Sequence, residues 1–244
     1  MIKEALQYII GLQQPRTEEI GGRQYYFRDG VPVMVDGCRD CKAVELSTLT
    51  SLVDYNKNRM VDDFPEGIPK MIAHVASETE VRLLTQFNGD MKRLEVLHVK
   101  ARVPDITLNR FMDQEAFIIQ MQSMFLDTPD KAIVMQVAGN VEDKTVANYG
   151  DDGVSQKATI KAGIAGKEDV IVPNPVRLQP FRTFHETGQQ ETEFVFRMKN
   201  SSSGGVACAL FEADGGAWKF RAVHEIAEYL KAELADAGNI AVLA

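Results

Sequence analysis

The chain has 244 residues, of which 45% are hydrophobic and 25% are charged, and this composition is that of an ordinary globular protein. Its formal net charge of -8 and its pI near 5.1 disfavour a protein whose whole surface contacts nucleic-acid phosphates, because such binding needs clustered lysine and arginine. The odd number of cysteines, three, argues against a disulfide framework. The sequence has no apolar run of about 18 residues, which argues against a membrane span, and no secretory-signal pattern at its first residues, which argues against export.

The first part of the chain predicts a helix followed by a hairpin. Apolar residues recur at helical spacing over 2–10, so we expect a short amphipathic helix there. Strands over 25–28 and 31–35 flank Asp29-Gly30, a dipeptide that tolerates positive φ at both central positions of a type I′ turn. Pro32 has no N–H to donate, which places its strand at a sheet edge or a bulge.

The next part predicts a helix, a loop and a second hairpin. Ser47 is placed to cap a helix whose inward face consists of Leu49, Leu52 and Val53. A loop is expected over 62–69. Apolar and polar residues then alternate over 81–87 and 91–101, on either side of Asn88-Gly89, which indicates another hairpin with a two-residue turn.

The middle of the chain predicts a helix that begins at Asp113, which is placed as its N-cap. One face of this helix carries Phe117, Met121, Met124 and Phe125, a stripe typical of a core. The helix is expected to end at 127–129. Residues 131–145 fit either a helix or a strand, and residues 154–161 alternate as a strand does before the glycine-rich turn at 163–166.

The last third predicts a β-meander followed by a helix. Turn-forming residues separate five expected strands, which are 170–178, 181–186, 193–199, 206–213 and 217–221. The nearly continuous apolar run at 206–211 needs cover on both faces, so we expect it to be a central strand. The final helix has an apolar stripe of Val223, Ile226, Ala227, Leu230 and Leu234, with which it would cover one face of this sheet.

These elements predict an α+β fold. We expect a C-terminal antiparallel β-meander of about five strands packed by the C-terminal helix, preceded by a half made of β-hairpins and short helices. A boundary between residues 1–130 and 131–244 is expected, or else one continuous domain, because no long linker separates the two parts.

Two sets of residues suggest metal chemistry, and for both we favour a structural role. Cys38 and Cys41 have the spacing of half a zinc site, and the missing ligands would come from Cys208, His74, His98 and His185, none of which is paired at ligand spacing. A hydrolase would gather Mg²⁺-binding carboxylates from Asp151, Asp152, Asp169, Glu186 and Asp214, most of which lie in predicted turns. We therefore predict no catalytic residue, no metal site and no cofactor.

Arginines of the meander are the best candidates for an anion or partner site. The segment 182–186 is the densest polar cluster, and as a strand it would place Arg182 and Glu186 on one face and His185 on the other. A histidine near a glutamate is more often a structural pair than a general base. The candidate ligand-binding or partner-binding residues are Arg177, Arg182, His185 and Arg197.

Three local patterns resemble the YfdQ-like family of phage and prophage proteins of unknown function. They are the helix of 46–56 that ends in Tyr55-Asn, the helix opening at 112–118, and the strand of 173–181 that ends in Pro180-Phe181. The resemblance covers roughly residues 20–240. It implies a mobile-element origin and a cytoplasmic role in phage replication or host conflict, and it supplies no catalytic residues.

The leading functional hypothesis is a non-enzymatic phage accessory protein that acts by binding a protein, a nucleotide or a nucleic acid, and that forms a homo-oligomer. A metal-dependent nuclease or nucleotide hydrolase is the alternative, and a structural or assembly protein of the virion is a third. We expect a cytoplasmic protein in the bacterial host cell, without contact to a membrane.

Overall fold

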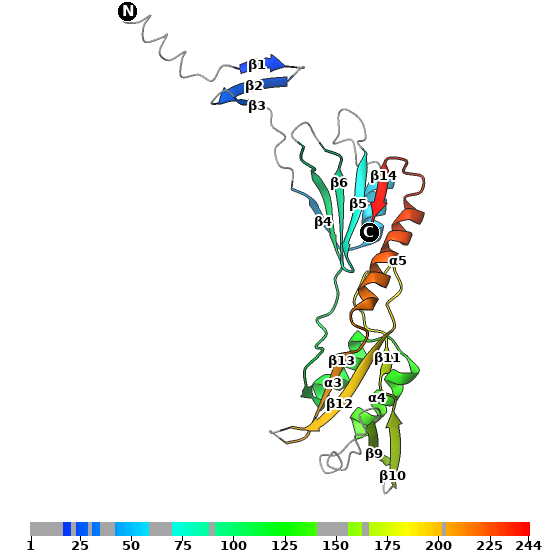
Figure 1. Cartoon of the computed structure of the whole chain (residues 1–244). Helices are drawn as coiled ribbons and strands as arrows, with labels where there is room; N and C mark the ends of the chain where they lie inside the picture. The colour runs from blue at the N-terminus through cyan, green and yellow to red at the C-terminus, as the bar shows by residue number, and fades with distance from the viewer. Residues whose placement is uncertain are drawn as a thin grey trace, which may run out of the picture. The chain divides into compact units, whose positions relative to one another are not determined.

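The computed structural model describes residues 17–20, 23–28, 31–34, 42–58, 70–87, 91–140, 156–162, 166–201 and 204–244 (Figure 1). The chain divides into two compact units, Met1–Lys42 and Ala43–Ala244. The predicted helix over 2–10, the turn at Asp29-Gly30 and the loop over 62–69 lie outside the described residues.

The described part of the first unit is a three-stranded antiparallel sheet. It consists of β1 (Thr17–Ile20), β2 (Arg23–Arg28) and β3 (Val31–Met34), in that order across the sheet. The pairing of Arg28 with Val31 confirms the predicted hairpin. Pro32 lies opposite Phe27 in β3, which is an edge strand, as its missing N–H requires.

The second unit contains a five-stranded sheet in the order β14-β5-β6-β7-β4. The three central strands, β5 (Met71–Ser77), β6 (Glu80–Thr85) and β7 (Glu95–Lys100), are antiparallel, whereas β4 (Val44–Leu46) and β14 (Ile240–Leu243) add in parallel at the edges. Strand β14 was not expected from the sequence. It brings the end of the chain beside β5, so this sheet forms from both halves of the sequence.

Helices α2 (Leu49–Lys57) and α5 (Ala217–Glu233) cover one face of this sheet. The inward residues of the strands alternate as a half-buried sheet requires, and they pack against the apolar stripe of α5. The final helix therefore covers the sheet formed largely by the first half of the sequence, and the expectation that it covers the C-terminal meander is wrong. The fully buried residues of this core include Leu49, Leu52, Leu83, Leu97, Ile226 and Leu230.

Two predictions for this region need correction. The N-cap of α2 is Thr48 rather than Ser47, and its hydroxyl accepts a hydrogen bond of 3.2 Å from the Ser51 amide. The hairpin of β6 and β7 has a longer connection than two residues, because regular pairing stops near Thr85 and β7 begins at Glu95 rather than at Met91. The Thr85 hydroxyl accepts from the Leu94 amide there, and this side-chain bond ends the backbone ladder.

A four-stranded sheet of the second unit has the order β11-β12-β13-β8. Its strands are β8 (Met112–Asp113), β11 (Val176–Leu178), β12 (Thr192–Asn200) and β13 (Val206–Glu212), and all neighbours are antiparallel. Strand β13 lies inside the sheet with its first five residues buried, which confirms the predicted central strand. A separate hairpin pairs β9 (Gln156–Ala162) with β10 (Gly166–Val172).

Helices α3 (Gln114–Met124) and α4 (Pro129–Asn140) pack on one face of the four-stranded sheet. The Asp113 carboxylate accepts from the Ala116 amide at 2.8 Å, so the predicted cap of α3 is confirmed. The ambiguous stretch that begins at residue 131 is helical as far as Asn140. The core between helices and sheet includes Phe117, Met121, Val134, Val137, Phe194 and Phe196.

The α+β class is confirmed, although three of the five expected meander strands differ. Residues 173–175 divide the first of them, so that β10 and β11 belong to different sheets. Residues 181–186 form no strand. Residues 217–221 are the start of α5, because the Asp214 carboxylate accepts from the Gly216 and Trp218 amides, both at 3.0 Å, and so initiates a helix.

No helix in the described part of the chain is both long enough and apolar enough to span a bilayer.

Candidate ligand-binding face

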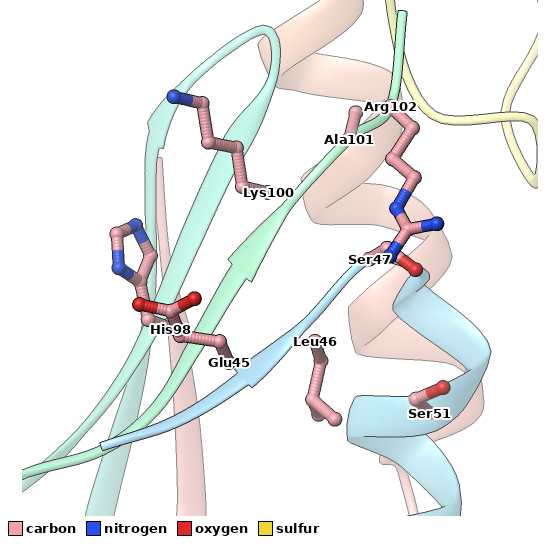
Figure 2. A pocket seen from close by; sticks show the side chains of 8 residues that line it. All are labelled: Glu45, Leu46, Ser47, Ser51, His98, Lys100, Ala101 and Arg102. Atoms are coloured by element: carbon pink, nitrogen blue, oxygen red, sulfur yellow. The ribbon is translucent and has the colours of Figure 1, made fainter. Parts of the chain in front are cut away.

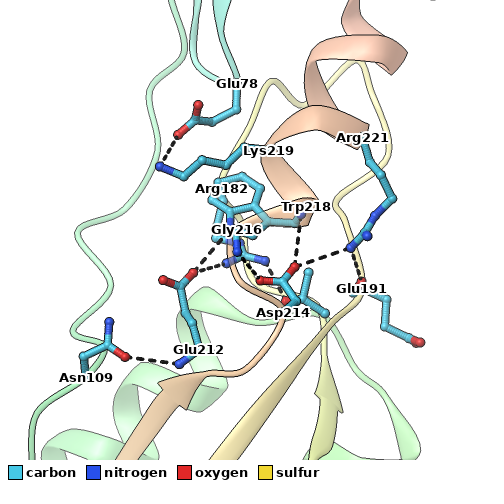
Figure 3. Close-up of polar contacts among 11 residues, drawn as sticks. Glu78, Asn109, Arg182, Glu191, Glu212, Asp214, Gly216, Trp218, Lys219 and Arg221 are labelled. Atoms are coloured by element: carbon cyan, nitrogen blue, oxygen red, sulfur yellow. Dashed lines mark hydrogen bonds and ion pairs between the residues drawn. The ribbon is translucent and has the colours of Figure 1, made fainter.

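Arg182 lies inside the second unit, where the four-stranded sheet meets the start of α5 (Figure 3). Its side chain is 9% exposed. The guanidinium donates to Glu212 Oε1 at 2.9 Å and to Thr192 Oγ1 at 2.6 Å, and its central carbon lies 3.7 Å from the centroid of the Trp218 ring. The Trp218 indole also donates to Glu212, at 3.3 Å. Two of the three guanidinium nitrogens of Arg182 therefore donate hydrogen bonds inside the protein, which gives this residue a structural role.

Burial lowers the pKa of Arg182 to about 10, and the neighbouring Glu212 carboxylate opposes that shift. The guanidinium is therefore still protonated near pH 7. Its Nε atom is buried and has no hydrogen-bond partner among the described residues. A charge held in this way orients Glu212 and Trp218, and it is not placed to meet a ligand from solvent.

The segment that follows Arg182 is held by side chains instead of a strand ladder. The Gln189 side-chain oxygen accepts from the backbone amides of Arg182 and Thr183, at 2.8 and 3.3 Å. Glu186 Oε1 accepts from the amide and the hydroxyl of Thr50 at the start of α2, at 3.1 and 3.3 Å. His185 is exposed on a turn beside the Phe181 ring. The structure therefore separates Arg182 from His185.

Two other candidates lie together on the four-stranded sheet. Successive side chains of a strand point to opposite faces, and Phe194, Phe196 and Met198 of β12 point into the core. Arg197 therefore points to the opposite face, as does Arg177 of β11. We call this surface the outer face, and its residues are Arg177, Glu193, Val195, Arg197, Lys199, Ala207, Ala209, Phe211 and Phe111.

The outer face has cations beside aromatic rings. The Lys199 ammonium lies 4.1 Å from the centroid of the Phe111 ring, and the Phe111 and Phe211 rings meet edge to face with centroids 5.9 Å apart. Arg197 and Lys199 form no ion pair within the described residues, and the Arg197 Nη1 atom is buried without a hydrogen-bond partner there. No helix of the described part packs on this face, because α3 and α4 lie against the other (Figure 1).

Arg177 is the most exposed arginine of the outer face. Its side chain is 66% exposed, and its guanidinium lies 3.7 Å from the carboxylate of Glu193, which is its cross-strand partner. An ion pair of this length at the surface contributes little to stability. Arg177 is consequently free to reorient toward an anion at the rim of the face.

A polar hollow of about 680 Å³ lies at the β4 edge of the five-stranded sheet (Figure 2). Figure 2 shows the His98 ring beside the Glu45 carboxylate, and Arg102 pointing toward Ser47. His98 Nε2 also lies 3.0 Å from Glu80 Oε1. Its charged lining consists of one carboxylate, Glu45, and two cations, Lys100 and Arg102, so the hollow has a small excess of positive charge.

The residues considered for metal chemistry are not gathered. Within the described residues, no group of three or more His, Cys, Asp or Glu side chains is placed to hold a metal ion. Asp214 accepts from the Gly216 and Trp218 amides at the start of α5, and Glu186 accepts from the start of α2, as described above. Cys208 is buried in β13, and burial raises the pKa of its thiol to about 12. Cys38, Cys41, Asp151 and Asp152 lie outside the described residues.

The sequence reasoning missed Lys199, Phe111 and Phe211. Lys199 lies two positions from Arg197 on one strand, so the alternation of side chains was a sufficient signal for it. Phe111 had no such signal, because it reaches the outer face only through the pairing of β8 with β13.

The chain matches no protein-family model, no curated protein and no solved structure.

Proposed function

We propose that this protein binds single-stranded nucleic acid on the outer face, as a non-enzymatic accessory protein of a phage or prophage. The observation that carries the proposal is the pair of cations without ion-pair partners in the described residues, Arg197 and Lys199, of which Lys199 lies against the Phe111 ring that meets Phe211. Cations attract phosphates, and the half-buried rings of Phe111 and Phe211 keep part of their surface in solvent, where unpaired bases can stack.

A single strand fits this face better than a duplex does. Bases of a duplex are stacked on one another and are not available to rings that lie on a sheet surface, whereas a single strand can present both its bases and its phosphates to the sheet. The formal net charge of -8 also opposes extensive wrapping by a duplex. We infer a short site with few phosphate contacts.

The phage or prophage origin and the cytoplasmic location rest on the resemblance to the YfdQ-like family in residues 46–56, 112–118 and 173–181. The neighbouring genes test this part of the proposal. Genes for phage replication or counter-defence beside this one support it, whereas a block of metabolic genes contradicts it.

We also propose that the protein is a homo-oligomer. Strands β14 and β4 are the two edges of the five-stranded sheet, and within the described residues no further strand pairs with either of them. Free backbone N–H and C=O groups at such edges favour pairing with a second copy. Size-exclusion chromatography with light scattering tests this, and a monomer at all concentrations contradicts it.

The binding proposal is tested by fluorescence anisotropy with labelled single-stranded DNA and RNA oligonucleotides. The variant Arg197→Ala/Lys199→Ala should bind about tenfold or more weakly than the parent protein. In a plot of log affinity against log salt concentration between about 50 and 200 mM, its slope should be smaller in magnitude by about two. Lys57→Ala/Lys231→Ala is the matched control, since it removes two exposed lysines distant in the fold from the outer face.

The control variant should bind as the parent protein does. Equal affinity of the parent and of Arg197→Ala/Lys199→Ala, or no binding by the parent at about 50 mM salt, contradicts the proposal. Gel analysis of the same oligonucleotides after incubation with Mg²⁺ or Mn²⁺ tests the alternative of a nuclease, which predicts cleavage.

A further inference from the structure

A groove of about 540 Å³ borders the outer face, between α3 and the segment that precedes it. Its apolar lining includes Met112, Ala116 and Ile119, and the Ile119 side chain is 55% exposed although it lies in the groove. Arg110 and Asp105 line the same groove, and neither forms an ion pair within the described residues. The groove thus offers an uncovered apolar surface with one donor group and one acceptor group.

The two walls of the groove are held together by Gln120 of α3, which is 6% exposed. Its side-chain oxygen accepts from the Thr107 amide at 2.7 Å, and its side-chain nitrogen donates to the Thr107 carbonyl at 3.2 Å. Both backbone polar groups of Thr107 are satisfied in this way. The groove is therefore formed before any ligand arrives, which lowers the entropic cost of binding.

Phe111 connects the groove with the outer face. It lines the groove, and the same ring contacts the Lys199 ammonium and the Phe211 ring. A strand whose phosphates lie near Arg197 and Lys199 would therefore pass directly beside the groove entrance.

We propose that the groove receives one unstacked nucleobase of the bound strand, an inference that rests on the proposed function. A base has two apolar faces and a polar edge, which match the lining of Met112 and Ile119 and the rim groups of Arg110 and Asp105. The guanidinium can donate to ring nitrogens or carbonyls of the base, and the carboxylate can accept from an exocyclic amine.

The test compares two labelled oligonucleotides, a decamer of deoxyadenosine and a decamer in which every position is abasic, in their binding to the parent protein and to Ile119→Ala. The parent should bind the intact decamer about tenfold more tightly than the abasic one. Ile119→Ala should reduce that ratio to about twofold, because the substitution should lower the affinity for the intact decamer and leave the affinity for the abasic decamer unchanged. Phe220→Ala, which removes a side chain 80% exposed on α5, is the control and should keep the parent ratio.

The inference is overturned if the parent does not distinguish the two decamers, or if Ile119→Ala changes their ratio no more than Phe220→Ala does. Because Ile119 is exposed, the variant should fold normally, and circular dichroism checks this. Arg197→Ala/Lys199→Ala should lower the affinity for both decamers by the same factor, and this result separates phosphate contacts from base contacts.

A second measurement separates the failure of the groove from the failure of the outer face. Free adenosine has no phosphate, so it should shift the NMR methyl signals of Ile119 and Met124 when it is added at millimolar concentration. Shifts with adenosine but no oligonucleotide binding would retain the groove and reject the outer face. Oligonucleotide binding that depends on Arg197 and Lys199, without any adenosine shift, would reject the groove alone.

Discussion

The guanidinium carbon of Arg182 lies over the indole of Trp218, 3.7 Å from the ring centroid, and both side chains donate to the carboxylate of Glu212. Arg182 precedes β12, Glu212 ends β13 and Trp218 lies in the first turn of α5. The contact therefore joins the four-stranded sheet to the helix that covers the five-stranded sheet (Figure 3).

Arg182→Ala should lower the free energy of unfolding by about 3 kcal/mol, because it removes a buried cation with its hydrogen bonds and its ring contact. Arg182→Lys keeps the charge but loses the planar contacts, so its loss should be smaller. Urea denaturation measures both. Arg177→Ala is the control, and since that side chain is 66% exposed its effect should stay within about 0.5 kcal/mol. An equal loss for both alanine variants contradicts this account.

Glu186→Ala should lower the free energy of unfolding by about 1 kcal/mol, because the carboxylate satisfies the Thr50 amide in the first turn of α2 and complements the positive end of that helix. Glu186→Gln keeps an acceptor but not the charge, so it should lose about half as much. Thermal unfolding followed by circular dichroism tests the order of the three proteins. Glu228→Ala, at an exposed position that forms a surface ion pair with Lys231, should have no measurable effect.

The Glu80 carboxylate accepts a hydrogen bond from Arg82 at 2.7 Å, and this bond holds its pKa below the usual value of 4.5. The folded state therefore takes up this proton less readily than the unfolded state does. The resulting stabilisation is present above pH 4.5 and is lost as the pH falls through the lower folded-state pKa. The stability difference between the parent and Glu80→Gln should shrink over that window in urea titrations. A constant difference from pH 7 to pH 3 would show that the ion pair does not contribute in this way.

The Cys208 thiol should react very slowly with a disulfide reagent in the folded protein, because it is buried and its pKa is raised to about 12. Cys38→Ser/Cys41→Ser leaves Cys208 as the sole thiol and isolates its signal. The reaction should become fast in denaturant. Rapid labelling of the folded variant contradicts the buried position of β13.

Leu230→Ala should lower the free energy of unfolding by about 2–5 kcal/mol, because Leu230 of α5 is fully buried in the core of the five-stranded sheet. Phe220→Ala on the same helix removes an exposed ring and should change stability by less than about 0.5 kcal/mol. Hydrogen exchange adds a positional readout. Protection of β5 and β6 amides should fall in Leu230→Ala, and loss of protection confined to β12 and β13 would contradict the packing of α5.

Local patterns were sufficient for the elements whose signals lie within a few neighbouring residues. The Asp113 cap, the inward stripe of α5, the edge position of Pro32 and the central strand at 206–211 each depend on side-chain spacing or on one residue's backbone chemistry. The prediction of a strand at 217–221 was wrong for a related reason. The alternation of apolar residues did not reveal that the Asp214 carboxylate, three residues before Ala217, accepts from the Trp218 amide and so favours a helix there.

The amino-acid sequence alone determined the α+β class, because alternation and helical periodicity are properties of neighbouring residues. The tertiary structure alone decided that Arg182 is buried against Trp218 while Arg197 faces outward, that β14 completes the five-stranded sheet and α5 covers it, and that Phe111 reaches the outer face. Each of these depends on contacts between residues far apart in the chain, and such contacts follow from how whole elements bury their apolar faces together.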